Sequence, residues 1–163
     1  PYPRPAEGKG EFFPPVIFLT LAGNYIIDSL VLVICFSIYK IAGLGLNLKS
    51  FYKQSILKVW GYGFLADIIG ASILFVLGLL GENLGLSYEL TSAICYDPFS
   101  KPLAVIIILG ATLVSAAFIF LFNYKYSFKN LIEDKTLRFK VALTIAIVTA
   151  PWTFLLPTKW FYY

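Results

Sequence analysis

The chain has 163 residues, of which 59% are hydrophobic and only 13% are charged, and its mean hydropathy is +0.80. A soluble domain is about half apolar and about a quarter charged, and it has no interior large enough for so much apolar surface. This composition excludes an ordinary water-soluble domain. It predicts an all-α integral membrane protein that uses the lipid bilayer as its solvent.

Several other classes are excluded by residue type. The chain has no histidine, the commonest zinc ligand and general base. Cys35 and Cys95 form no CxxC pair, so we interpret them as inert thiols, with a bridge to another chain through Cys95 as the alternative. No phosphate-binding loop or nucleophile motif occurs. We therefore expect no enzyme activity, no metal and no cofactor.

The N-terminal half is predicted to contain a leader and two spans. Residues 1–14 carry four prolines and four charges and are expected to form a polar, extended leader. Residues 15–41 are long enough to cross about 30 Å of hydrocarbon and form the first predicted span. A basic linker follows, and residues 59–80 form the second span. The glycines of this span, Gly61, Gly63, Gly70 and Gly78, favour close helix contacts.

The C-terminal half is predicted to contain an outer loop, two further spans and a tail. Residues 81–102 are too polar to span, but Ser87 favours the start of a short surface helix, and Asp97 is expected to cap the turn that contains Pro98. The remaining spans are predicted at residues 103–122 and 141–156. Residues 159–163 form an aromatic tail, typical of a membrane-interface anchor.

The loop charges predict the orientation of the bundle. Residues 40–58 and 124–140 carry nine of the thirteen Lys and Arg residues, and the leader, the loop 81–102 and the tail carry the other four. By the positive-inside rule the two basic loops are cytoplasmic, so both termini face outward. The formal charge of +4 therefore reflects topology and does not indicate nucleic-acid binding. The expected location is the plasma membrane.

Three polar side chains fall inside the predicted spans: Asn24 and Asp28 in the first, and Asp67 in the second. Ionisable groups at membrane depth are costly, by about 2.5 to 3.5 kcal/mol or more, and usually serve a function. Asn24 and Asp28 lie one helical turn apart. Both aspartates are about 12 to 13 residues, or ~20 Å, from the outer ends of their spans. No Lys or Arg is predicted at that depth.

The missing positive partner of these carboxylates is a proton, a bound cation or a basic residue of another chain. Two functions remain open on this basis. The first is a structural or accessory subunit of a membrane complex, assembled with itself or with other subunits, in which Asp28, Asp67 and Asn24 make polar contacts to another subunit or within the bundle. The second is a small transporter or channel component in which the same residues form a proton or cation site.

Pro151 is the remaining candidate, because it lies inside the fourth predicted span. It cannot donate a backbone hydrogen bond to the carbonyl of Ile147, so a helix kink with a freed acceptor is expected. One interpretation is a packing kink in which a neighbouring threonine binds the freed carbonyl. The other is a broken helix that lines an ion path.

Overall fold

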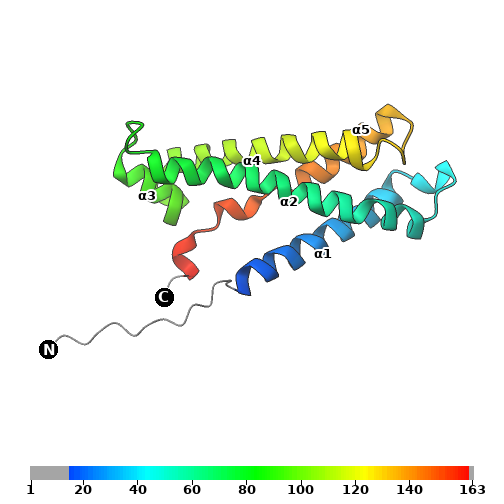
Figure 1. Ribbon diagram of the computed structural model, residues 1–163, viewed down its shortest axis with the longest axis horizontal. Helices are drawn as coiled ribbons and strands as arrows, with labels where there is room; N and C mark the ends of the chain where they lie inside the picture. Colours follow the sequence, from blue (N-terminus) through cyan, green and yellow to red (C-terminus); the bar gives the residue numbers. More distant parts are fainter. Residues whose placement is uncertain (1–14, 162–163) are drawn as a thin grey trace.

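The computed structural model describes residues 15–161, which form a bundle of helices (Figure 1). No strand occurs in this range, and four helical segments are long and apolar enough to span a membrane. The predicted all-α class with four spans is thus confirmed at that level. The predictions for the leader 1–14 and for Tyr162 and Tyr163 lie outside the described residues. The helices are α1 (Pro15–Ile38), α2 (Leu48–Leu80), α3 (Tyr88–Tyr96), α4 (Pro102–Phe122) and α5 (Lys135–Val148).

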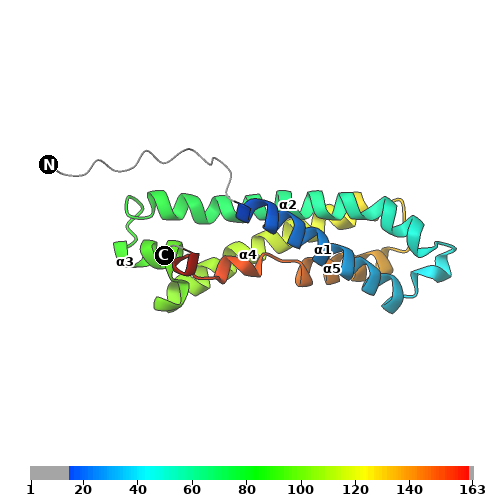
Figure 2. The ribbon, with the colours of Figure 1, turned by 90° about the horizontal axis from the view of Figure 1, so that it is seen from below.

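Helices α2 and α4 form the long antiparallel pair at the centre of the bundle (Figures 1 and 2). Small residues allow their backbones to approach closely. A Cβ atom added to Gly70 on α2 would overlap Ser115 Oγ of α4 and lie 3.1 Å from the carbonyl oxygen of Ala111. Ser115 Oγ donates a hydrogen bond of 3.0 Å to the carbonyl of Ala66. The predicted role of Gly70 in helix contact is confirmed.

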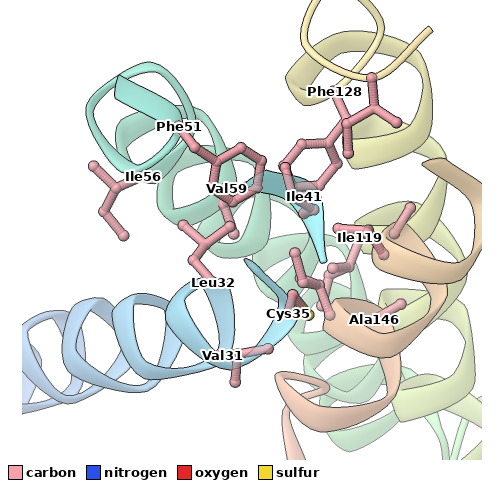
Figure 3. Close-up of a cluster of buried hydrophobic side chains, with 14 of the residues drawn as sticks. Val31, Leu32, Cys35, Ile41, Phe51, Ile56, Val59, Ile119, Phe128 and Ala146 are labelled. Carbon is pink, nitrogen blue, oxygen red and sulfur yellow. The ribbon is translucent and has the colours of Figure 1, made fainter. Parts of the chain in front are cut away.

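The loops that join α1 to α2 and α4 to α5 lie at one end of the bundle, here called the basic end. The larger of two buried apolar clusters begins there (Figure 3). Phe51 of α2 stacks on Phe128 after α4, with ring centroids 6.0 Å apart, and Cys35 of α1 is fully buried beside them. The cluster ties α1, α2, α4 and α5 together. Its buried members are Val31, Leu32, Cys35, Ile41, Phe51, Ile56, Val59, Ala66, Ile119, Phe128, Ile132, Val141, Ala142, Ile145 and Ala146.

The opposite end carries α3 and the last residues of the chain and is here called the terminal end. Its smaller cluster joins α3 to α4 and is built from Leu90, Ala93, Ile94, Ala104 and Ile108. As predicted, Ser87 caps α3 by accepting a hydrogen bond from the backbone N–H of Leu90. The prediction for Asp97 is wrong. Its side chain caps no turn and instead forms an ion pair with Lys159, which is 62 residues further along the chain.

Helix α2 begins at Leu48, eleven residues before the predicted Val59. Asn47 caps it, because Asn47 Oδ1 accepts a 2.7 Å hydrogen bond from the backbone N–H of Ser50. Phe51 and Ser55 then recur with helical spacing on the buried side, while the lysines of this stretch are exposed. Most of the predicted basic linker is therefore helix. The lysines of this stretch suggested a polar linker, because its amphipathic pattern can be recognised only when the neighbouring helices that bury one side are known.

Two other boundaries also differ from the predictions. Helix α1 ends at Ile38 instead of residue 41, because Lys40 adopts a left-handed backbone conformation with φ of 51° and turns Ile41 into the core. Helix α5 starts at Lys135, six residues before the predicted Val141. Asp134 caps it by accepting a 2.8 Å hydrogen bond from the backbone N–H of Thr136.

Candidate functional site

Helix α5 stops at Val148, although the apolar sequence continues to Leu156. Pro151 lies in the break and is followed by the 3₁₀ helix η4 (Trp152–Leu155). The carbonyl of Ile147, which Pro151 cannot serve, accepts a 3.1 Å hydrogen bond from the indole Nε1 of Trp152. The freed acceptor was predicted, but its donor is Trp152 and not a threonine. The expected kink is a complete break, since the chain leaves the helix axis at Thr149.

The break faces α1 and α2 across a cavity of about 140 Å³. Asn24, Asp28, Asp67 and Pro151, the four residues singled out from the sequence, all line this cavity. The sequence left open whether the two aspartates turn toward the same space, and here they do. The remaining lining residues are Ile27, Gly63, Phe64, Val148, Thr149, Ala150, Trp152 and Thr153.

Asp67 has one weak partner inside the chain. Asn24 Nδ2 lies 3.5 Å from Asp67 Oδ2, at the long limit of a hydrogen bond. The other oxygen, Asp67 Oδ1, is shielded from solvent and has no hydrogen-bond partner among the described residues. A carboxylate normally fills its acceptor positions when it leaves water. Asp67 therefore has acceptor capacity that the described residues do not use.

Asp28 is the more isolated of the two carboxylates. Its exposed fraction is only 5%, and within residues 15–161 no hydrogen bond or ion pair reaches its side chain. Gly63 of α2 lies opposite it, since a Cβ atom at that position would be in ordinary van der Waals contact with Asp28 Oδ2, at 3.8 Å. Burying an unpaired charge is costly. The geometry thus calls for a positive charge or a proton at Asp28.

The end of α5 adds to the negative character of the cavity. The carbonyls of Val148 and Thr149, both lining residues, accept no hydrogen bond from the described part of the chain. Unpaired carbonyls at a helix C-terminus carry partial negative charge and favour cations. No Lys or Arg lines the cavity. Two carboxylates and one helix C-terminus therefore border one space that has no internal counter-charge.

Sequence reasoning missed two contributors to this site. Gly63 was identified only as a helix-contact residue, and its relation to Asp28 depends on the rotation of α1 against α2. Trp152 has no local signal, because the carbonyl that accepts its hydrogen bond is free only once α5 has broken.

Comparisons with protein-family models, with curated proteins and with solved structures found no match for this chain.

Proposed function

We propose that this chain is a membrane-embedded component of a small transporter or channel, in which Asp28 and Asp67 hold a proton or a cation. The observation that carries the proposal is the convergence of both carboxylates on one cavity without a basic side chain. Such intramembrane carboxylates form the proton relays and ion sites of membrane proteins. A broken helix whose C-terminal carbonyls meet the same space is the arrangement by which many transporters coordinate cations.

The bilayer is the proposed environment of the bundle. Large apolar side chains remain exposed along the helices, among them Leu30 at 58%, Phe75 at 66% and Leu113 at 67%. In water such a surface would drive aggregation, whereas lipid covers it. The charge bias between the two ends supports a plasma-membrane protein with its basic end in the cytoplasm and its terminal end outside.

The cavity size supports an ion and not an organic solute. A water molecule needs roughly 10 to 15 Å³ of such volume, so about 140 Å³ accommodates a small cation with several waters. Pockets for organic ligands are usually about 300 to 1,000 Å³. A cavity of about 140 Å³ is not by itself a route across a membrane. The proposal therefore includes assembly with further copies or other subunits to complete the route across the membrane.

The test is ion flux in vesicles that contain the purified protein. Asp28→Asn and Asp67→Asn are expected to assemble normally and to reduce proton- or cation-coupled flux at least about tenfold, since each removes a charge that the ion requires. Glu82→Gln is the matched control, because Glu82 is an exposed carboxylate away from the cavity. Wild-type flux in both cavity variants would exclude this site.

A structural or accessory subunit is the second candidate function. The cavity alone does not open a path, and α2 presents an outward apolar face on which nothing lies within 4 Å of the added Cβ position at Gly61. Such a face suits packing against another helix. Native mass spectrometry of the gently solubilised protein tests this candidate. A copurifying chain with a basic residue at the depth of Asp28 would make the two aspartates assembly contacts.

A further inference from the structure

The last described segment, residues 149–161, is here called the C-terminal strap. It leaves the end of α5 and runs between α1 and α3 toward the terminal end (Figures 1 and 2). Its first part, from Thr149 to Thr153, forms one wall of the carboxylate cavity. Phe154 and Leu155 then pack against the cluster at the terminal end. The strap therefore connects the cavity directly to the end of the bundle that carries α3.

The strap is fastened to α3 and the turn after it by two polar contacts. Thr158 Oγ1 donates a 2.6 Å hydrogen bond to the carbonyl of Cys95. Lys159 Nζ forms an ion pair with Asp97. The lysine side chain is 52% exposed and the aspartate 29%, so water competes with this pair. Both contacts lie at the far end of the strap, beyond Phe154 and Leu155.

The strap lacks the backbone bonding that would make it rigid. Its own backbone hydrogen bonds are local, such as those from Phe154 N–H to Pro151 O and from Leu156 N–H to Thr153 O. Within residues 15–161, no backbone hydrogen bond joins it to α1 or α2, the helices that carry the aspartates. Pro151 and Pro157 also separate its short 3₁₀ turns. Segments of this kind open locally at low cost.

We propose that the C-terminal strap is a lid on the carboxylate cavity, latched by the Asp97–Lys159 ion pair and by the contact between Thr158 and Cys95. When latched, it closes the cavity toward the terminal end. When released, it admits water and small cations from that side to Asp28 and Asp67. That the lid admits a cation or a proton rests on the proposed function, but the opening and closing of the lid can be measured without any ion flux.

The native Cys95 provides a way to lock the strap. Thr158→Cys places a second thiol beside it, since Cys95 and Thr158 line one groove. Partial burial raises the pKa of the Cys95 thiol, so oxidation with copper phenanthroline is carried out at alkaline pH and verified by peptide mapping. The probe is a water-soluble carbodiimide with an amine nucleophile, and mass spectrometry follows the labelling rates of Asp28, Asp67 and the exposed Glu82.

In the oxidised Thr158→Cys protein, labelling of Asp28 and Asp67 is expected to slow at least about tenfold, because reagent entry requires the strap to open. Labelling of Glu82, away from the strap, is expected to stay unchanged. A reductant should restore the original rates. If the disulfide does not form under oxidant, the latch at Thr158 is refuted. If it forms and the cavity labels at the unlocked rate, the lid is refuted.

The opposite change is to release the latch. Asp97→Asn and Lys159→Gln are each expected to increase the labelling rates of Asp28 and Asp67 about threefold or more, and the double variant no further, since both remove one ion pair. Glu89→Gln is the matched control. It removes the Glu89–Lys101 ion pair at the same end of the molecule, and within residues 15–161 neither of these residues has a hydrogen bond or ion pair with the strap. An equal acceleration in the control would refute a specific latch.

A separate arm distinguishes the lid from the proposed function. Sodium or potassium chloride is added to the unlocked protein at constant pH, the pH is lowered in a separate series, and the labelling of Asp28 and Asp67 is measured in both. A cation that occupies the site is expected to slow labelling, with Glu82 again as the reference. Lock and release effects without any cation effect, and with the same pH dependence of labelling at Asp28 and Asp67 as at Glu82, would retain the lid and refute the ion site. Cation protection without lock or release effects would retain the ion site and refute the lid.

Discussion

Helix α2 makes two contacts in which a glycine faces a polar side chain of a neighbouring helix, but only one of these side chains is hydrogen bonded. At Gly70 it accepts the side chain of Ser115 from α4, and at Gly63 it accepts the side chain of Asp28 from α1. In both contacts a glycine lies opposite a buried polar group on the neighbouring helix, too close for a Cβ atom at Gly70 and at ordinary van der Waals distance at Gly63. Ser115 completes its contact with a hydrogen bond to the carbonyl of Ala66. Asp28 has no such bond within the described chain, and a cavity of about 140 Å³ lies beside it.

The two contacts differ in that Ser115 is hydrogen bonded and Asp28 has no hydrogen-bond partner among the described residues. A satisfied hydroxyl in a tight interface stabilises the packing of two helices and leaves no room for a ligand. An unsatisfied carboxylate next to a cavity lowers stability until a proton or cation arrives. The α2–α4 contact should therefore be sensitive to added volume, and the α1–α2 contact to changes of charge.

The largest expected effect is that of added volume at Gly70. Gly70→Ala is expected to lower the free energy of unfolding by about 1 to 3 kcal/mol, because the new methyl group overlaps Ser115 Oγ and lies 3.0 Å from Phe154. Thermal unfolding in detergent, followed by tryptophan fluorescence, measures the change. Gly63→Ala is the matched control and should be neutral or up to about 1 kcal/mol more stable, given alanine's helix propensity. Equal losses of stability at both glycines would mean that the two contacts do not differ in their tolerance of added volume.

Removing the polar group on each side should have opposite effects. Ser115→Ala is expected to reduce stability by about 1 kcal/mol, since it deletes a buried hydrogen bond. Asp28→Asn is expected to leave stability unchanged or to increase it by about 1 kcal/mol in buffer of low cation content, since it removes an unpaired buried charge. The same unfolding assay compares them. A loss at Asp28 as large as that at Ser115 would indicate a structural role for the aspartate.

A smaller effect is expected at the break of α5. Trp152→Phe keeps an aromatic ring but removes the hydrogen bond to the Ile147 carbonyl, and should lower stability by about 0.5 to 1.5 kcal/mol. Trp160→Phe is the control, because Trp160 is 61% exposed and its indole makes no hydrogen bond in the described range. Calorimetry in detergent is suitable here, since both changes alter tryptophan fluorescence. Equal effects would mean that the indole donor contributes nothing.

The smallest effect concerns the terminal end and pH. Lys101, through its hydrogen bond and charge, lowers the pKa of Glu89 from its ordinary value of 4.5. The pair therefore stabilises the fold above that value, and its contribution is lost as the pH falls through the lowered pKa. Because the pair is exposed, the shift in unfolding temperature should be slight and should disappear in Glu89→Gln. An unchanged pH profile in that variant would assign the acid sensitivity to other groups.

The sequence identified much of the architecture because hydropathy and helix signals are local. Four apolar segments, the small helix after Ser87 and the position of Asp28 and Asp67 within two of those segments were all readable from residue type and spacing. The starts of α2 and α5 were predicted eleven and six residues too late. Lysines made the first turns of α2 and α5 look like polar linkers. The buried positions in these turns can be recognised only when the helices that cover them are known.

The sequence alone therefore determined that this protein is helical, apolar enough for a membrane and in need of a counter-charge near two carboxylates. The tertiary structure alone decided that Asn24, Asp28, Asp67 and the break at Pro151 share one cavity, and that Trp152 serves the carbonyl freed by the proline. Helix rotation is set by packing between distant segments, such as Gly63 against Asp28 and Gly70 against Ser115. Neither contact has a signature in the local sequence, because each depends on partners more than thirty residues away.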